Sequence, residues 1–339
     1  MSWARGIGAP PRWTRATSTD RNHKPQCANL PSSTVAKSWG GSPQERFLVS
    51  ADGGSIRKLT LEEVTRLQGF PAGWFDVRGV TATDRIGLAG NAVPPPVGAA
   101  AFEALGLVGV GPRVLELFAG GGGLALGATW AGFDVEALVD YWPPSATILR
   151  ARFGAERVIF APVESLDLST FEGDVLSGGP PCQPFTSGGK RLGEDDPRDR
   201  CTALPLMLGA MRPPAFVFEE ARQLYGHKGG SYWRKLVGAF NKLGYSVGAV
   251  QLNSHDYGLP QIRCRAFVAG FSRDYGFGLG DARAWTTELM HLAEPGAGGV
   301  VADILEEDPA EAWADWEYGC RRPLTRRQWC PTKVIGVYG

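Results

Sequence analysis

The 339-residue sequence predicts an α/β fold organised around a doubly wound, parallel sheet. Three observations predict this class. Short apolar runs alternate with segments of helical apolar spacing, a glycine cluster separates the first run from its helix, and acidic residues end two later runs. Strands that alternate with helices favour a parallel sheet with helices on both faces.

The elements follow in that order along the chain. The first strand, RVLELF at 113–118, leads into the glycines of 119–123 and then into a helix. The further predicted strands are 134–140, 173–179, 215–220 and a pair at 246–254 and 265–271. The further predicted helices are 143–153, 203–211 and 232–245.

Several residues that could take part in binding or catalysis lie at the carboxyl ends of these strands. They are Gly120–Gly123, Asp140, Cys182 and Glu219. Open parallel sheets bind their ligands at the carboxyl ends of the strands. We therefore expect residues far apart in the sequence to converge on one crevice.

Charge is balanced overall, because 35 Lys and Arg residues match 35 Asp and Glu residues. The whole chain therefore has no net positive field that would indicate a nucleic-acid partner. Residues 302–318 carry only acidic charge and 320–339 only basic charge, which is typical of a solvated surface or of a phosphate-contacting strip. The absence of a long apolar run or secretory signal predicts a cytoplasmic protein with no membrane partner.

The six cysteines, at 27, 182, 201, 264, 320 and 330, form no CxxC pair and have no histidine at metal-ligand spacing. We expect neither a metal site nor a disulfide framework. Cys182 follows two glycines and two prolines in GGPPCQPF, which would present its side chain to the crevice. It is either a buried structural thiol or a nucleophile, and the nearby Lys190 and Arg191 would favour the thiolate.

The glycine cluster at 119–123 permits either close helix packing or cofactor binding. It lacks the lysine and hydroxyl of a phosphate-binding loop and fits the dinucleotide fingerprint poorly. Asp140, at the end of the next strand, suits a pair of ribose hydroxyls. Together these residues favour an adenosyl ligand, either S-adenosylmethionine or a nicotinamide cofactor.

Glu219 ends an apolar strand, where a carboxylate is costly unless it is paired or faces a site. It is therefore either a salt-bridged residue or a site residue. Arg263 and Arg265 alternate on an extended segment, which points both to one face. There they would hold a carbonyl, a phosphate or a structural carboxylate.

Four segments together resemble the DNA (cytosine-5) methyltransferases. LFAGGGGLALG is similar to the family's cofactor loop, GGPPCQPFTSGGKRLGEDDPRD to its catalytic Pro-Cys-Gln loop, FVFEEA to its Glu-Asn-Val motif and DYGLPQIRCR to its Gln-x-Arg-x-Arg motif. The resemblance implies a Rossmann-like, S-adenosylmethionine-dependent methyltransferase domain with a smaller, irregular target-recognition region that binds double-stranded DNA. It also implies a nucleoid-associated protein of prokaryotic or phage origin, with restriction partnership, phage protection and regulation all open as its role.

Two further segments resemble the family in an unusual order. RKLTLEEVTRLQGFP (57–71) and GNAVPPPVGAAAFEALG (90–106) are similar to segments that usually close the catalytic domain, yet here they precede the cofactor loop. The chain thus resembles a circularly permuted member, which is tolerable where domain termini are exposed and close together. This order implies a catalytic domain at 51–272 and a target-recognition region divided between 1–50 and 273–339.

The resemblance also implies roles for individual residues. Cys182 would add to carbon 6 of a flipped-out cytosine, Glu219 would hold the ring's N3 and amino group, and Arg265 with Arg263 would contact the base or order the loop. A methyl group from S-adenosylmethionine would then pass to carbon 5. The residues implied to bind the cofactor are Phe118, Gly120, Gly122, Asp140, Tyr141 and Asn91, and those implied to bind the substrate are Gln183, Thr186 and Gln261.

Three places depart from the family's pattern. Glu220-Ala221 stand for the Asn-Val of the motif, Pro162 for an acid that usually meets the adenine amino group, and Arg200-Cys201 for a common Leu-Phe pair. The departures keep two other interpretations open. One is a cytosine-5 transferase that acts on RNA or uses a modified donor, and the other is a catalytically weak DNA-binding or regulatory protein.

Overall fold

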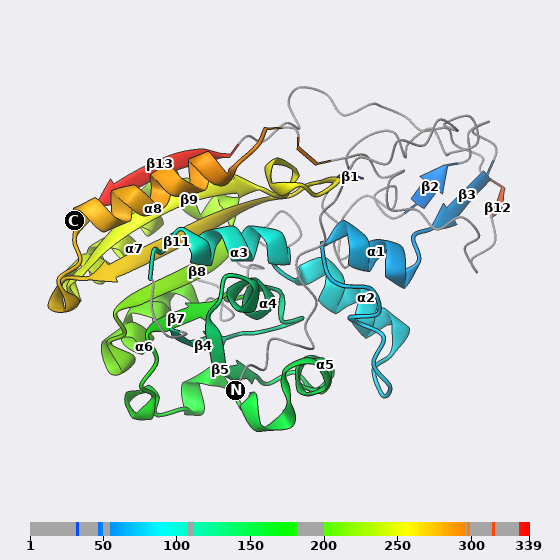
Figure 1. Cartoon of the computed structure of the whole chain (residues 1–339), viewed down its shortest axis with the longest axis horizontal. Helices are drawn as coiled ribbons and strands as arrows, with labels where there is room; N and C mark the ends of the chain where they lie inside the picture. Colours follow the sequence, from blue (N-terminus) through cyan, green and yellow to red (C-terminus); the bar gives the residue numbers. More distant parts are fainter. Residues whose placement is uncertain are drawn as a thin grey trace.

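The computed structural model of the chain describes residues 32–33, 47–49, 55–107, 112–181, 200–295, 297–298, 314–315 and 332–339. Its centre is an eight-stranded sheet with helices on both faces (Figure 1). The predicted α/β class, with a Rossmann-like doubly wound core, is confirmed.

The main sheet has the strand order β13-β9-β11-β8-β7-β4-β5-β6. The bounds are β13 (Lys333–Tyr338), β9 (Tyr245–Asn253), β11 (Cys264–Ser272), β8 (Ala215–Ala221), β7 (Val175–Gly178), β4 (Arg113–Leu117), β5 (Asp134–Asp140) and β6 (Val158–Phe160). The strands from β8 to β6 are parallel, as expected, whereas β11, β9 and β13 pair antiparallel with their neighbours. Only residues 254–263 connect β9 to β11, which is shorter than the crossover of about a dozen residues that parallel neighbours require.

Helices bury apolar side chains on both faces of this sheet. The apolar cluster on one face includes side chains of α3 (Pro95–Glu103), α4 (Gly123–Trp130), α5 (Pro143–Phe153) and α8 (Leu279–Leu292). It continues into α1 (Leu61–Leu67) and α2 (Ala82–Asn91), which contact each other, and α2 contacts α5. The other face packs against α6 (Leu204–Met211) and α7 (Ser231–Lys242). The buried residues of α7 recur at helical spacing, so that one apolar stripe faces the sheet: Tyr232, Trp233, Leu236, Val237 and Phe240.

Glycines bring α4 into backbone contact with α3. A Cβ atom on Gly127 would lie 2.5 Å from the amide nitrogen of Ala99 and 2.8 Å from the carbonyl oxygen of Pro95. A Cβ atom on Gly123 would overlap the carbonyl oxygen of Val93. Close helix packing, one of the two interpretations of the glycine cluster, is therefore correct for its last glycine.

The carboxyl ends of β4 and β7 lie at the point where the direction of strand order reverses. β5 and β6 extend the sheet on one side of β4, and β7 and β8 extend it on the other. Leu117 of β4 pairs with Gly178 of β7, which pairs in turn with Phe218 of β8. The next residues along these strands, including Glu219, therefore lie side by side at the edge where such sheets bind ligands.

Regular structure continues beyond residue 272. α8 and the edge strand β13 belong to the main sheet and its covering layer, although the sequence placed both segments in the target-recognition region. Two small sheets pair β1 (Ser32–Ser33) with β10 (Gln261–Ile262), and β12 (Ala314–Asp315) with β3 (Ser55–Lys58) and β2 (Phe47–Val49). The predicted division into domains stays a prediction.

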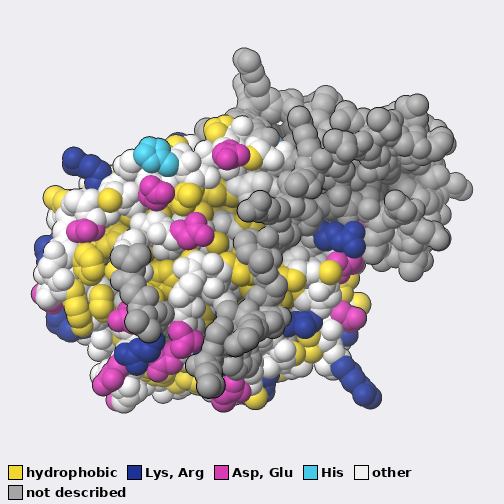
Figure 2. Space-filling view, viewed as in Figure 1, with side chains coloured by type: hydrophobic (Ala, Val, Ile, Leu, Met, Phe, Trp, Pro, Cys, Tyr) yellow, Lys and Arg dark blue, Asp and Glu magenta, His cyan; other side chains and the backbone are white. Residues whose placement is uncertain are grey.

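Charges of both signs are interspersed on the described part of the face shown in Figure 2. That distribution agrees with the balanced composition of the chain. Among the described residues, no helix is both long enough and apolar enough to cross a membrane. Of the basic segment 320–339, residues 320–331 lie outside the described residues.

Candidate active site

A cavity of about 400 Å³ opens at the carboxyl ends of β4, β5, β7 and β8. The residues that line it come from segments distant in the sequence: Leu88, Asn91, Ala92, Val93, Glu116, Phe118, Ala119, Gly120, Gly121, Gly123, Leu124, Asp140, Tyr141, Trp142, Val163, Gly179, Pro180, Pro181, Glu219, Arg263 and Arg265. The predicted convergence on one crevice is thus found for the described residues. Gly122 and Gln261 are predicted site residues that do not line this cavity.

The turn after β4 is held by Asp140. One carboxylate oxygen accepts the amide N–H of Gly120 at 2.8 Å, and the other accepts that of Trp142 at 2.8 Å. Phe118 adopts a φ of 56°, a left-handed conformation that costs a residue other than glycine on the order of 1–3 kcal/mol. Asp140 therefore orders the glycine turn, and its predicted contact with ribose hydroxyls stays a prediction.

Gly122 serves the packing of the turn. Its φ of 78° suits glycine, and a Cβ atom there would lie 2.9 Å from the ring of Phe153 and 3.0 Å from the side chain of Leu149. Tyr141, by contrast, lines the cavity with 62% of its surface exposed, where a planar ligand could stack. The two predicted cofactor residues therefore occupy different environments.

Glu116 is a cavity residue that the sequence reasoning missed. Its side chain is only 2% exposed, and among the described residues its Oε2 atom has no hydrogen-bond partner. Burial raises the pKa of Glu116 well above its ordinary value, and the neighbouring Asp140 raises it further. The available signal was an acid within the apolar run RVLELF, which is costly unless it faces a site.

Glu219 and Arg265 form an ion pair in the wall of the cavity. Arg265 Nε lies 3.0 Å from Oε1 of Glu219. Burial raises the pKa of Glu219, while the charges of Arg265 and Arg263 oppose that rise. A Cβ atom on Gly179 would lie 3.3 Å from Oε2 of Glu219, which places this carboxyl beside the chain that leads to residue 182. Glu219 is thus salt-bridged and lines the cavity, and its predicted role as a site residue stays a prediction.

Arg263 holds the chain around Asn91. Its Nη1 atom donates to the carbonyl of Gly90 at 2.9 Å, and its Nη2 atom donates to the carbonyl of Asn91 at 3.2 Å. These carbonyls end α2, where a cation also suits the helix dipole. Arg263 thus positions a segment of the cavity wall, which is the carbonyl-binding alternative left open for this arginine.

Gln261 is fully buried, and its side-chain amide donates to the carbonyl of Leu67 at 3.4 Å. Its predicted contact with substrate stays a prediction.

Cys182, Gln183 and Thr186 lie outside the described residues, but Pro181, the residue before Cys182, lines the cavity. In the described ranges, no three His, Cys, Asp or Glu side chains are grouped to hold a metal ion.

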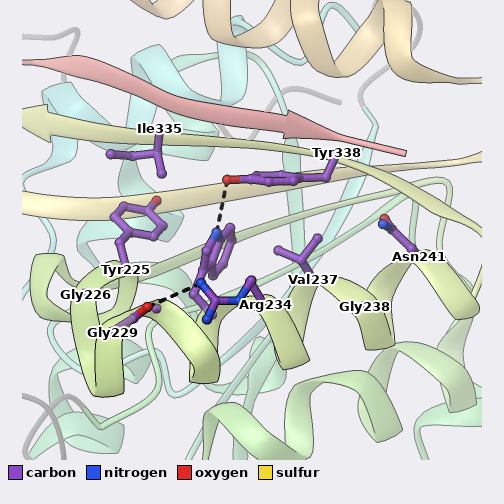
Figure 3. Close-up of a pocket in the computed structure, with 11 residues that line it drawn as sticks. Tyr225, Gly226, Gly229, Arg234, Val237, Gly238, Asn241, Ile335 and Tyr338 are labelled. Carbon is purple, nitrogen blue, oxygen red and sulfur yellow. Dashed lines mark hydrogen bonds between the residues drawn. The ribbon is translucent and has the colours of Figure 1, made fainter.

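A second cavity, of about 680 Å³, lies between α7 and β13 (Figure 3). Three of the polar side chains that line it, Trp233, Arg234 and Tyr225, are hydrogen-bonded to neighbouring groups of the protein. Trp233 Nε1 donates to the hydroxyl of Tyr338 at 3.2 Å, and Arg234 donates to the carbonyl of Gly229 at 3.3 Å. Tyr225 donates its hydroxyl to main-chain carbonyls of the sheet. None of the predicted site residues lines this second cavity.

Comparison with known proteins places the chain among DNA methylases. The family model described as C-5 cytosine-specific DNA methylase matches residues 11–106 and 112–326. The type II methyltransferase M.NgoMIV of Neisseria gonorrhoeae is 35% identical over 227 residues, a match covering 65% of this chain and 67% of that protein. For M.NaeI of Lentzea aerocolonigenes the values are 30% over 213 residues, covering 60% of this chain and 49% of that protein.

Among solved structures, the S. pombe Dnmt2 methyltransferase aligns with 22% identity and a TM-score of 0.37, covering 48% of this chain and 51% of that one. The chain spans about half the length of M.NaeI. The family match includes the glycine turn, Glu219 and Arg265, which the cavity brings together, and the segment that contains Cys182. The chain belongs to the C-5 cytosine-specific DNA methylase family.

Proposed function

We propose that this protein is a DNA cytosine-5 methyltransferase that uses S-adenosylmethionine and a covalent bond from Cys182. The observation that carries the proposal is the single cavity shared by the glycine turn, the Glu219–Arg265 pair and Pro181. A cofactor and a base bound in this cavity would both be within reach of the chain that bears Cys182.

The described residues fit S-adenosylmethionine. The buried Oε2 of Glu116, which has no hydrogen-bond partner in the described part of the chain, suits an ammonium group, which the methionine end of this molecule carries. The glycine turn exposes main chain at the cavity, Tyr141 offers an aromatic face to adenine, and Asn91 offers an amide to the carboxylate. When bound, S-adenosylmethionine supplies an electrophilic methyl group.

The protein's own residues would make carbon 5 of cytosine nucleophilic. The Cys182 thiolate forms a bond to carbon 6, and Glu219 shares its proton with N3 as charge develops on the ring. Burial raises the pKa of Glu219, which favours the protonated form that this step needs. After methylation, a base removes the carbon-5 proton, and the electrons of that C–H bond restore the ring double bond as the sulfur leaves.

The target base has to leave the helix before Cys182 can reach it. Extrusion of a base from a duplex costs a few kcal/mol, which contacts with the protein offset. We propose double-stranded DNA as the substrate and the cytoplasm of a prokaryote, or a phage gene, as the setting. The named bacterial type II methyltransferases support this assignment and a role in restriction-modification.

The circularly permuted order is part of the proposal. Its support is that Asn91 and Val93, from residues 57–106 (the early segment), line the same cavity as the glycine turn. In addition, Trp74 Nε1 of the early segment donates to the carbonyl of Gly121 at 2.9 Å. The family match also divides into two ranges at residues 107–111, just before β4.

The test is adduct formation with a pool of random-sequence duplexes that contain 5-fluorocytosine, because fluorine at carbon 5 blocks release of the cysteine. In the presence of S-adenosylmethionine, the protein is expected to form a denaturation-resistant complex. Cys182→Ala is expected to form none, and Cys264→Ala, a buried cysteine elsewhere, is the matched control.

Nucleoside mass spectrometry of unmodified DNA and RNA gives the product. The expected product is 5-methylcytosine in DNA. An adduct that persists in Cys182→Ala, or methylation of RNA alone, would contradict the proposed function.

A further inference from the structure

Near its carboxyl end, β8 carries two neighbouring buried acids, Glu219 and Glu220, that face opposite sides of the sheet. Glu219 lines the cavity, whereas Glu220 is only 3% exposed and lies on the side covered by α6 and α7. Successive side chains of a strand point to opposite faces, so this separation follows from the strand itself. The proposed mechanism uses Glu219 and leaves Glu220 without a role.

Glu220 contacts the first helical turn after residues 182–199, which we call the Cys182 segment. The thiol of Cys201 donates to Oε1 of Glu220 at a sulfur–oxygen distance of 3.6 Å, and the N–H of Ala221 donates to Oε2. Cys201 is 1% exposed and begins the short helix Cys201–Ala203. The preceding Arg200 forms an ion pair with Glu164. Residues 200 and 201 are therefore held on one side by β8 and on the other by the segment that follows β6.

A charge on Glu220 would be poorly tolerated. Burial raises its pKa well above its ordinary value, and the nearby carboxyl of Glu219 raises it further. The opposing groups are the Ala221 N–H, the Cys201 thiol and Arg265 on β11, which already pairs with Glu219. These are the titratable and charged groups of the described residues that act on Glu220, and an un-ionised acid fits them best.

We propose that Glu220, as an un-ionised carboxylic acid, and Cys201 form a positioning pair that holds residue 201, where the chain continues from the Cys182 segment, against β8. The inference rests on the proposed function, because it gives the pair its consequence for catalysis. Ionisation of Glu220 would place a negative charge in a buried site next to the carboxyl group of Glu219 and would weaken the attachment of residue 201 to β8. Methyl transfer would then fall with the un-ionised fraction of Glu220.

The ionisation state is tested without any assay of activity. The infrared difference between the wild-type protein and Glu220→Gln at pH 7.5 is expected to contain the carbonyl stretch of a protonated carboxyl group. A carboxylate band in its place would overturn the proposal. The matched control is Glu103→Gln, which removes a less buried carboxyl of raised pKa on α3 and should leave the Glu220 band of the protein unchanged.

Thermal unfolding gives a second readout of the same state. The stability contributed by un-ionised Glu220 is complete below its ordinary pKa of 4.5 and is lost as the pH rises through its higher folded value. Glu220→Gln should therefore gain stability relative to the wild type between pH 5 and pH 8. A difference that stays constant over this range would contradict an un-ionised Glu220.

Catalysis is tested by single-turnover methyl transfer between pH 6 and pH 9. The ratio of the Glu220→Gln rate to the wild-type rate should rise by up to about tenfold per pH unit once Glu220 ionises. The KM for S-adenosylmethionine should stay constant, because Glu220 faces away from the cavity. A ratio that stays constant over a pH range in which the infrared band of the protonated carboxyl group disappears would overturn the positioning role.

Cys201 supplies the other half of the test. Cys201→Ala removes the donor to Glu220 and should lower kcat, whereas Cys201→Ser keeps a hydroxyl donor and should restore it. Equal kcat values for the alanine and serine variants would contradict the pair. Absence of methyl transfer in every protein would contradict the proposed function, while the infrared result would still decide the state of Glu220.

Discussion

At the scale of single residues, burial raises the pKa of three glutamates at or beside the cavity. Among the described residues, Oε2 of Glu116 has no hydrogen-bond partner, whereas Glu219 has Arg265 beside it and Glu220 accepts hydrogen bonds from a thiol and an N–H. The charge of Asp140 adds to the rise for Glu116, and the charge of Arg265 opposes the rise for Glu219. Three buried acids within one region therefore differ in the groups that favour or oppose their ionisation.

Glu116 should make cofactor binding depend on pH. Its pKa is raised in the free protein, and an ammonium group beside it would favour the carboxylate, so binding should release a proton. Affinity for S-adenosylhomocysteine should increase from pH 5.5 to pH 7, which stays below the α-amino pKa of about 7.7–8.0. Calorimetry in buffers of different ionisation enthalpy measures both quantities.

Glu116→Gln should bind more weakly at pH 7 and should lose this pH dependence. The matched control is Glu136→Gln, which removes an exposed acid paired with Arg113 on β4. Persistence of proton release in Glu116→Gln would assign it to another group.

Glu219→Gln should separate holding the base from protonating it. The amide keeps a similar shape but cannot supply the acidic proton, so kcat should fall by about 10²–10⁴-fold, the usual contribution of a general acid. Cofactor affinity should change little, because Glu219 lies toward the β8 side of the cavity. Single-turnover kinetics and calorimetry on the same preparation measure the two effects, and a kcat near that of the wild type would remove Glu219 from proton transfer.

At the scale of elements, the contact between α3 and α4 holds the early segment against the glycine turn. Gly127 and Gly123 allow the backbones to meet, and Trp74 adds a hydrogen bond to the turn. This packing places Asn91 and Val93 in the cavity wall. The glycine-rich sequence therefore serves both the turn and the approach of a helix from another part of the chain.

Gly127→Ala should lower the free energy of unfolding by about 1–3 kcal/mol, the usual cost of overpacking. The added Cβ would meet main-chain atoms of α3, which cannot move as a side chain can. Gly238→Ala on α7 is the matched control, because nothing lies within 4 Å of its added Cβ. That control should raise stability by about 0.5–1 kcal/mol through helix propensity. Denaturant unfolding of both variants measures the difference, and equal effects would argue against close packing at Gly127.

Local sequence pattern predicted the elements of the central sheet well. The predicted strand 134–140 and helix 143–153 coincide with β5 and α5. The pattern did not indicate α8 or β13, because their segments lie among blocks of charge that suggest surface structure. Nor did it indicate the antiparallel direction of β11, which depends on the length of its connection and on the neighbours available for pairing.

At the scale of the whole molecule, the cavity is shared by segments separated by most of the chain. Arg263, which lies between β10 and β11, donates hydrogen bonds to the carbonyls that end α2. Trp285 Nε1 of α8 donates to the carbonyl of Ala101 on α3 at 2.9 Å. The early segment is therefore packed on both the glycine turn and the end of the sheet. Cofactor binding should depend on all of these parts being present.

A chain divided at residues 108–111 tests this dependence. The fragment 112–339 alone should not bind S-adenosylhomocysteine measurably, because it lacks Asn91 and Val93 and exposes the apolar surface under α3. Co-expression with fragment 1–107 should restore binding, since the contacts between the two parts are non-covalent. Calorimetry on the purified fragment and on the pair measures the effect, and full affinity in 112–339 alone would contradict it.

The sequence by itself determined the family, the alternation of strands and helices, and the residues that the family resemblance assigns to the site. These depend on local pattern and on motifs that the chain carries in contiguous form. Only the tertiary structure decided that Arg263 binds carbonyls while Arg265 binds Glu219, that Gln261 is buried away from the cavity, and that Glu116 faces it. It also decided that Glu220 meets Cys201. Those outcomes depend on strand register and on which segments pack together, and a side chain's partner is set by that packing and not by its position in the sequence.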